Sequence, residues 1–555
     1  MKKAVIAVLI ALAVGAAGFW FAGRPAYRRH QELRAAEQAV EFMAKGDQRN
    51  ASVSARRALQ LNPRNLKACE VMAELNELSR SPGALDWRRR IAETAPTIEN
   101  KLRLAATGMR SQGPPFTLAT QTLEELGDSG KDNPAYHTVA GELAVKLKHR
   151  AEAAAHFEAA SRLDPANEMN QLNVAVLRLD STNAEAAAAS RATLERLRAN
   201  PTLRAIALRW LVAEALQKRD QASAERFSRE LIADPQSELG DRLEHLNILR
   251  ESKIPEATAY LTAVQKGAAT NAAQVYDMSV WLISHGMVDD AVPWLTNLLA
   301  TVRNEQPAPL ALVDCYLAKK DWSGLQTYLD GQKWGDQEFL RFAFLSRAAA
   351  EQKQTLAAEA RWRSAVREAG ERLGALSRLL ALASRWGREK ACEDLLWQIG
   401  QRFPRERWAF ADLGRLYEAK DNTSGLNKLA AAQLSYDPKD FRAQSNLAGT
   451  SLLLRLNLPH AHELAREVHS QHPEEAVAVA NYAYSLHLQR RTKEGLAVLE
   501  KLKPEVRETP PVVLYYGVLL AAAGETNQAA KYLEIAQRSR LLPEEKVLAV
   551  EAGRN

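Results

Sequence analysis

The chain of 555 residues contains little cysteine, glycine, proline or aromatic side chain. Its three cysteines, Cys69, Cys315 and Cys392, lie far apart and form no C-x-x-C pair, so they indicate neither a disulfide framework nor a zinc site. Glycine (27) and proline (22) together fall below the roughly 12% of average proteins. These shortages exclude a collagen, a disordered tail and a glycine-rich all-β chain. The 46% of hydrophobic residues instead predict alanine- and leucine-rich helices with a large buried surface.

A strong charge of one sign and the familiar catalytic motifs are missing as well. The 74 basic and 67 acidic residues are interspersed and leave a net charge of +7, which does not imply nucleic acid as a partner. The sequence contains no G-x-S-x-G, G-x-x-x-x-G-K-[ST], G-x-G-x-x-G or H-E-x-x-H motif. We therefore expect a protein that is not an enzyme and that binds no cofactor.

One long uncharged segment stands at the amino terminus, from Ala4 to Ala22. As a helix it would span roughly 28 Å, close to the thickness of the hydrocarbon core of a bilayer. An aromatic edge at Trp20 and a basic edge at Arg24 and Arg28 follow, as in an interfacial anchor. Residues 1–23 are therefore predicted to form a transmembrane anchor, with residues 4–22 in the membrane. A cleaved signal peptide and a buried soluble helix are the alternatives.

The location follows from this segment. Basic residues are evenly matched on its two sides, but a start of Met-Lys-Lys before an apolar run is typical of exported chains. The sequence thus predicts a single-pass protein of the bacterial inner (cytoplasmic) membrane, with the remaining chain periplasmic. A cytoplasmic-facing orientation is the alternative.

From residue 30 onward the chain repeats. Proline follows Asn or Asp at several sites, and the spacing is near 34 residues, as between Pro201 and Pro235 and between Pro404 and Pro438. Asn or Asp caps a helix and proline suits its first turn, so each pair is predicted to mark a helix start. Between these sites lie two helical stretches joined by a short polar turn, which together form one helical hairpin.

These hairpins resemble the tetratricopeptide repeat (TPR), whose consensus places small and bulky residues at fixed positions of two helices. One segment carries the pattern from Gly141 to Pro165, another from Leu413 to Pro438, and two more lie near the end of the chain. The predicted repeat-signature residues are Gly141, Ala153, Phe157, Ala160, Pro165, Leu413, Gly414, Tyr417, Pro438, Gly449, Ala461, Pro473, Gly517, Ala529 and Ala536.

The resemblance implies an all-α fold, a right-handed superhelical solenoid of stacked helix-turn-helix hairpins with a concave groove, behind the N-terminal transmembrane helix. Loop-forming residues interrupt the repeat at two places, which we interpret as seams. The predicted divisions are residues 1–23 as the anchor, 24–107 as N-terminal hairpins, 108–133 as an irregular loop, 134–235 as further hairpins, 236–270 as an irregular helical seam, 271–543 as the C-terminal array and 544–555 as a tail.

Two clusters are candidates for a site. His462, His469 and His472 share one predicted helix with His460 close by, and same-face imidazoles bind metals, although the repeat phase places them on a solvated flank. Nine of the eleven tryptophans fall between Trp210 and Trp408. Their near-regular spacing favours core packing over an aromatic recognition strip.

The sequence therefore predicts a membrane-anchored TPR scaffold or adaptor that binds protein partners in its concave groove, in the assembly of a cell-envelope complex. One alternative is an interaction subunit of a polysaccharide or lipid export or assembly machine. The other is an enzyme with an unrecognised metal-dependent site at the histidines.

Overall fold

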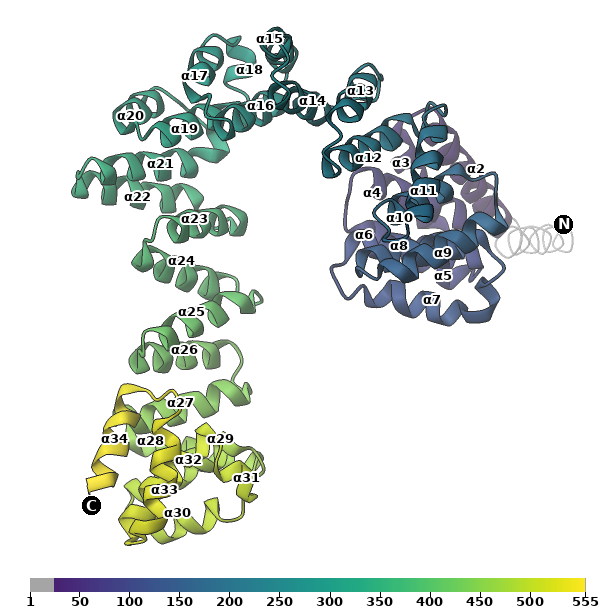
Figure 1. The fold of residues 1–555 in the computed structure, drawn as a ribbon. Coiled ribbons are helices and arrows are strands. Elements are labelled where there is room, and N and C mark those ends of the chain that lie inside the picture. Colours follow the sequence, from purple (N-terminus) through teal and green to yellow (C-terminus); the bar gives the residue numbers. More distant parts are fainter. Residues whose placement is uncertain (1–23, 555) are drawn as a thin grey trace, which may run out of the picture. The chain divides into compact units, whose positions relative to one another are not determined.

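The computed structural model describes residues 24–554, and these are almost entirely helical, with no strand among them. The chain packs as two compact units, and each is described by itself. The predicted all-α fold built from helical hairpins is confirmed for the described residues, because successive helices pack against each other as antiparallel neighbours along each unit (Figure 1). The predicted anchor, residues 1–23, lies outside the described residues.

The first unit holds the described residues up to His285 together with Trp294–Ala308. Its helices are α2 (Arg24–Ala44), α3 (Gln48–Leu61), α4 (Leu66–Leu78), α5 (Gly83–Thr94), α6 (Ile98–Ser111), α7 (Thr117–Gly130), α8 (Pro134–Lys146), α9 (Arg150–Leu163), α10 (Glu168–Arg178), α11 (Ala184–Leu197), α12 (Arg204–Gln217), α13 (Gln221–Ile232), α14 (Leu239–Glu251), α15 (Ala257–Ala268), α16 (Ala272–Ser284) and α18 (Ala300–Arg303). Helix α17 (Val288–Thr296) contributes residues to both units.

The second unit holds Gly286–Pro293 and the described residues from Pro309 onward. Its helices are α19 (Ala308–Lys319), α20 (Trp322–Asp330), the 3-10 helix η2 (Gly335–Gln337), α21 (Glu338–Glu351), α22 (Thr355–Ala369), α23 (Leu373–Arg385), α24 (Glu389–Arg402), α25 (Arg407–Ala419), α26 (Thr423–Tyr436), α27 (Phe441–Leu454), α28 (Leu458–Gln471), α29 (Ala476–Leu488), α30 (Thr492–Leu499), α31 (Pro504–Arg507), α32 (Pro510–Ala523), α33 (Thr526–Gln537) and α34 (Pro543–Arg554).

The turn inside a hairpin is closed by a residue in the left-handed region. After α8, Lys148 has φ 64°, its N–H donates to the Val145 carbonyl, and the His149 N–H donates to the Ala144 carbonyl at 2.8 Å. This pair of bonds is the Schellman motif, which usually uses glycine because a side chain costs about 1–2 kcal/mol there. Basic residues are favourable beside the negative end of a helix dipole. The same left-handed geometry recurs at Arg80, Arg219, Lys253, Lys320, Lys353, Arg455 and Arg490.

The Asn-Pro and Asp-Pro pairs do not all mark helix starts. Asn133 does cap α8, with its side chain accepting from the Ala135 N–H and Pro134 in the first turn. Asp164 and Asp437, by contrast, are the C-caps of α9 and α26. Proline there follows the end of a helix, which it cannot continue. The prediction is corrected for these pairs: the next helix begins a few residues later.

Parts of the predicted irregular regions are helical. Residues 117–130, inside the predicted loop 108–133, form α7, because Ala119, Leu123 and Leu126 recur at helical spacing and are buried. A kink with φ 41° at Gly127 is the irregular point. Helices α14 and α15 occupy most of 236–270, and α34 most of 544–555. The domain boundaries themselves stay predictions.

Within residues 24–554, no helix is both long and apolar enough to cross a bilayer. The predicted location as a single-pass inner-membrane protein is therefore corrected. Segment 4–22, on which that prediction depended, is not among the described residues.

Candidate functional site

The inner side of the first unit contains a cavity of about 340 Å³ between three successive hairpins. Helices α8, α10 and α12, each the first helix of its hairpin, supply most of its wall. The turn after α8 and the start of α9 supply the rim. The lining residues are Val145, Lys148, Arg150, Val176, Leu177, Leu179, Asp180, Trp210, Ala213, Glu214 and Gln217.

Two large apolar side chains at this cavity remain exposed. Trp210 is 43% and Val145 is 46% exposed. In α12 the core stripe is made by Leu208, Leu211 and Ala215, which are fully buried, so the fold does not use Trp210 for packing. Exposed tryptophan beside a concavity is typical of a binding surface rather than of a core.

Ion pairs hold the wall in place. The Arg150 guanidinium donates to the Leu177 carbonyl at 2.9 Å and to the Asp180 carboxylate at 2.8 Å. Glu214, only 4% exposed, accepts from Arg191 at 2.6 Å and lies 2.5 Å from the Lys218 ammonium. The contacts of Arg150 and Arg191 join neighbouring helices, the Glu214–Lys218 pair lies within α12 and its C-cap, and together they neutralise most charges around the cavity.

Lys148 is different, because it is exposed and has no ion-pair partner within residues 24–554. Its position is set by the left-handed turn described above. The cavity therefore offers an apolar floor and one free positive charge at the rim. This combination suits a segment that inserts an apolar side chain and carries an acidic group next to it.

The repeat-signature residues lie in the helix packing and not at this cavity. A Cβ at Gly141 would stand 2.8 Å from Phe157 Cε1, and one at Gly449 would stand 2.7 Å from Asn481 Oδ1. Gly517 is similarly close to Leu533, at 3.0 Å. At Gly414 the nearest atom is 3.6 Å away, an ordinary contact.

The other signature positions are of two kinds. Ala153, Phe157, Ala160, Leu413, Tyr417, Ala461, Ala529 and Ala536 are buried. Pro165, Pro438 and Pro473 lie in the turns between hairpins.

The structure does not bring His462, His469 and His472 to one point. His462 Nδ1 lies 2.8 Å from the Ser485 hydroxyl, His469 stacks on Tyr482, and His472 lies against Phe441. Burial lowers the pKa of His462 and His469 below the usual histidine value. No group of three or more His, Cys, Asp or Glu side chains in the described part of the chain is arranged to hold a metal ion.

The described tryptophans differ in exposure. Trp281, Trp334 and Trp362 are buried, Trp210 and Trp408 are exposed, and the others are partly buried: Trp87, Trp294, Trp322, Trp386 and Trp397. Sequence reasoning did not single out Trp210, although one signal was available. The segment LRWLVAEAL has more apolar positions than one stripe of an α-helix needs, so one of them had to face outward.

Comparisons with known proteins give only distant likenesses. No protein-family model matches the chain, and no curated protein matches it. Among solved structures, pilF of Pseudomonas aeruginosa is 17% identical over 40% of this chain and 99% of that one, with a TM-score of 0.33. The Cut9–Hcn1 hetero-tetramer of APC/C is 10% identical over 94% and 96%, with a TM-score of 0.30. A tetratricopeptide repeat protein from Parabacteroides merdae is 15% identical over 51% and 99%, with a TM-score of 0.24.

These TM-scores are too low to carry an argument. The assignment of a helical-repeat fold therefore depends on the helices of this chain and their packing.

Proposed function

We propose that this protein is a non-catalytic scaffold that binds an extended segment of a partner protein at the cavity between α8, α10 and α12. The observation that carries the proposal is the pair of exposed apolar side chains, Trp210 and Val145, at a cavity of about 340 Å³ with ion-paired walls. A concave, largely preformed apolar site with a few polar groups is the usual geometry of a binding site.

The partner segment has a defined chemistry. An aliphatic or aromatic side chain would fill the cavity against Trp210 and Val176, and a carboxylate one or two residues away would meet Lys148. Gln217 and the Arg150–Asp180 pair at the rim can exchange hydrogen bonds with the segment's backbone.

The envelope-assembly role depended on the membrane location, and the export-machine alternative depended on the family resemblance alone, so neither belongs to the proposal. The metal-dependent alternative needed the histidines to share a site, and they face separate partners.

Display selection with the full chain tests the proposal. A library of random twelve-residue peptides should yield sequences that combine an apolar and an acidic residue. In fluorescence anisotropy, W210A and K148E should each weaken binding of these peptides at least tenfold, a loss of about 1.4 kcal/mol. The matched control is W408A, which removes another exposed tryptophan, 37% exposed, in the second unit.

Failure to enrich any peptide, or equal binding by W210A and the unmodified chain, would exclude this cavity as the binding site.

A further inference from the structure

The last helix of the chain returns to a turn about 120 residues earlier in sequence. Arg540, just before α34, donates to the Asp421 carboxylate at 3.1 Å, and the Lys546 ammonium donates to the same carboxylate at 3.2 Å. The buried Thr423 hydroxyl donates to Glu544. Asp421 and Thr423 belong to the turn between α25 and α26, so α34 spans several hairpins within the second unit.

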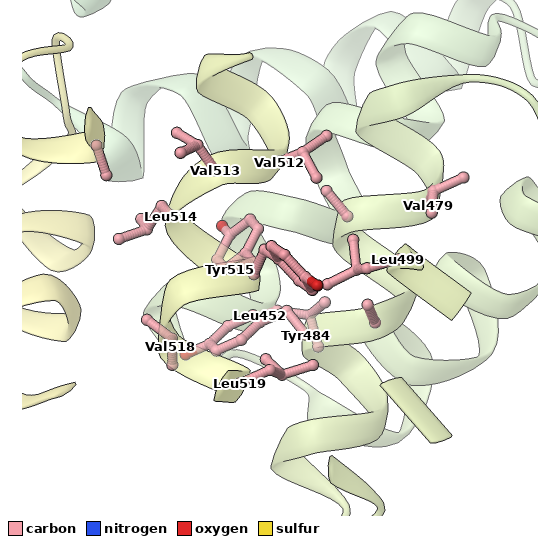
Figure 2. Packing of buried hydrophobic residues seen from close by; sticks show 14 of the residues in the cluster. Leu452, Val479, Tyr484, Leu499, Val512, Val513, Leu514, Tyr515, Val518 and Leu519 are labelled. Carbon is pink, nitrogen blue, oxygen red and sulfur yellow. The ribbon is translucent and has the colours of Figure 1, made fainter. Parts of the chain in front are cut away.

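Helix α34 packs against α27, α32 and α33, and Figure 1 shows it in yellow beside α27. Helices α27 and α32 are the first helices of their hairpins. Side chains of both helices, and of α29 which packs against each of them, belong to one large apolar cluster of this unit. Figure 2 shows part of it, including Leu452 of α27, Tyr484 of α29 and Tyr515 of α32. The rings of Tyr484 and Tyr515 stack with centroids 4.7 Å apart. We call the surface of α27, α32 and α33 that contacts α34 the α34 seat.

One stripe of α34 faces the seat. Glu545, Ala549 and Ala552 recur at helical spacing, and Ala549 is 1% exposed, with Leu548 partly buried beside it. Glu545 is close enough to add to the effect of burial in raising the pKa of Tyr515. On the opposite face, Val547 and Val550 are 54% and 47% exposed. The side chains of α34 that face the seat are thus mostly small, and the opposite face carries exposed valines as well as charged residues.

The contacts of α34 with the seat are partly unfavourable. Ala549 is buried, Leu548 and Ala552 are partly buried, and Leu541 just before the helix is 5% exposed, while Arg540 also donates to the Glu418 carbonyl. The two ion pairs with Asp421 are exposed, and such pairs contribute about 0–1 kcal/mol. The Glu545 carboxylate has no cationic partner among the described residues and accepts only from the Leu542 N–H, at 2.8 Å. A carboxylate that is buried without a cation disfavours the docked helix, which lowers the free-energy cost of opening α34 locally.

We propose that the α34 seat is a helix-binding surface which α34 occupies in cis, and that a helix of a partner protein with the same pattern of small apolar and polar side chains displaces it. That partner helix has small apolar residues three and four positions apart, a carboxylate in its first turn for Thr423, and a cation for Asp421. This inference goes beyond the proposed function, because it concerns the other unit and a helical ligand instead of an extended one.

The polar contacts explain how the seat selects its ligand. Apolar packing on alanines is tolerant of register, whereas Thr423 and Asp421 fix where the first turn of the helix must lie. A carboxylate at that turn also suits the positive end of the helix dipole. A ligand lacking the carboxylate or the cation would bind less tightly than α34 and would leave α34 in place.

The test uses the full chain and a fluorescein-labelled peptide of residues 540–554. The substitution A549D buries a charge under α34 and should release it while the seat stays intact. The peptide should bind A549D at least tenfold more tightly than the unmodified chain. The control V547D places the same charge on the exposed face and should bind the peptide as weakly as the unmodified chain does. A peptide that itself carries A549D should bind neither the unmodified chain nor the A549D and V547D variants.

A cross-linked form completes the test. The pair T423C and E544C, in a chain whose three native cysteines are replaced by alanine, should trap α34 on the seat, so the peptide should bind only after reduction. Hydrogen exchange of A549D should show rapid exchange in residues 543–554 with α32 still protected. Peptide binding that is equal in A549D and V547D, binding to the cross-linked form, or loss of protection in α32 would each overturn the proposal.

Discussion

The first helices of the hairpins leave their inner side open in one part of the molecule and covered in another. At α8, α10 and α12 of the first unit, Trp210 and Val145 remain exposed at a cavity. At α27 and α32 of the second unit, α34 lies over the corresponding helices and buries Tyr515 to 4% exposure. A stacked hairpin covers its neighbours along the array but not its inner side. That side is therefore filled by the chain itself or left for a ligand.

Both units use ion pairs between helices, including Arg388 with Glu359 in the second unit, but the contacts between large aromatic side chains are concentrated in the second unit. In the first unit, buried or partly buried arginines pair with carboxylates, as in Arg88 with Glu77 and Arg209 with Asp241. In the second unit, aromatic rings meet edge to face, as in Trp362 with Trp386 at 6.4 Å and Trp397 with Phe410 at 6.2 Å. Removing one partner of a buried ion pair is strongly destabilising, and the strength of the pair depends on pH. Packing of phenylalanine and tryptophan rings does not depend on pH.

The largest effect is expected from R88A. Arg88, 5% exposed, makes two hydrogen bonds to Glu77, at 2.9 and 2.8 Å, and Thr107 donates to the same carboxylate. Removing the guanidinium leaves the partly buried carboxylate with only the longer ion pair to the exposed Arg110, at 3.3 Å, so the cost is expected at the lower end of about 3–5 kcal/mol. Native-state hydrogen exchange in α4 and α6 measures the loss. The neighbouring R89A, at an exposed ion pair, should change the same exchange by less than about 0.5 kcal/mol.

If R88A and R89A were equally mild, the buried ion pair of Arg88 would contribute no more to the first unit than an exposed pair does.

Lowering the pH should destabilise the first unit by protonating the Glu77 carboxylate. Hydrogen bonds from Arg88 lower the pKa of Glu77 from 4.5 to about 2. Its contribution to stability, on the order of 3 kcal/mol, is complete above pH 4.5 and is lost as the pH falls toward 2. Acid titration of exchange in α4 to α6 follows this loss. E77Q should be less stable at neutral pH and should lack this pH dependence, and a variant that keeps it would show that another group is responsible.

The signature glycines give a comparison across the units. G141A in the first unit should destabilise by about 1–3 kcal/mol, because the new methyl group would stand 2.8 Å from the Phe157 ring. G414A in the second unit has room, with its nearest neighbour at 3.6 Å, and should be neutral or stabilising by up to about 1 kcal/mol. Thermal unfolding followed by circular dichroism distinguishes them, and equal shifts would contradict this assignment of close contacts.

The smallest effect is expected from E545Q, in helix α34 of the second unit. Burial raises the pKa of the Glu545 carboxyl, with Glu544 adding to the shift. The docked helix is therefore favoured at low pH, and this contribution is lost as the pH rises through the docked pKa. Removing the charge should slow hydrogen exchange of residues 543–554 at neutral pH by a factor equivalent to about 1 kcal/mol. E551Q, on an exposed residue of the same helix, should leave that exchange unchanged.

Several features could be predicted from the sequence because they depend on local spacing. Residues Gly141 and Phe157 were placed in the packing of one hairpin by their helical periodicity alone. The pairing of Asp164 with Pro165 was interpreted as a helix start, and the structure makes Asp164 a C-cap. Both ends of a helix accept an Asn or Asp followed by proline nearby, so the dipeptide alone does not distinguish them.

The candidate sites needed information that spacing does not hold. Trp210 was grouped with the core tryptophans, because periodicity gives the face of a helix but not whether a neighbour covers it. The contact of Asp421 with Lys546 joins residues about 120 positions apart, and no local pattern in either segment points to the other. The location in the membrane was predicted from residues 4–22. That prediction is wrong, because no described helix is long and apolar enough to cross a bilayer.

The sequence by itself determined the elements of this protein: helices from the apolar periodicity, hairpins from the small residues at close approach, and an array from the 34-residue spacing. Only the tertiary structure decided which inner surfaces are open and which are closed. The physical reason is range, since helix formation and hairpin packing depend on residues within about one repeat, whereas the cover of a groove depends on where a distant segment of the chain comes to rest.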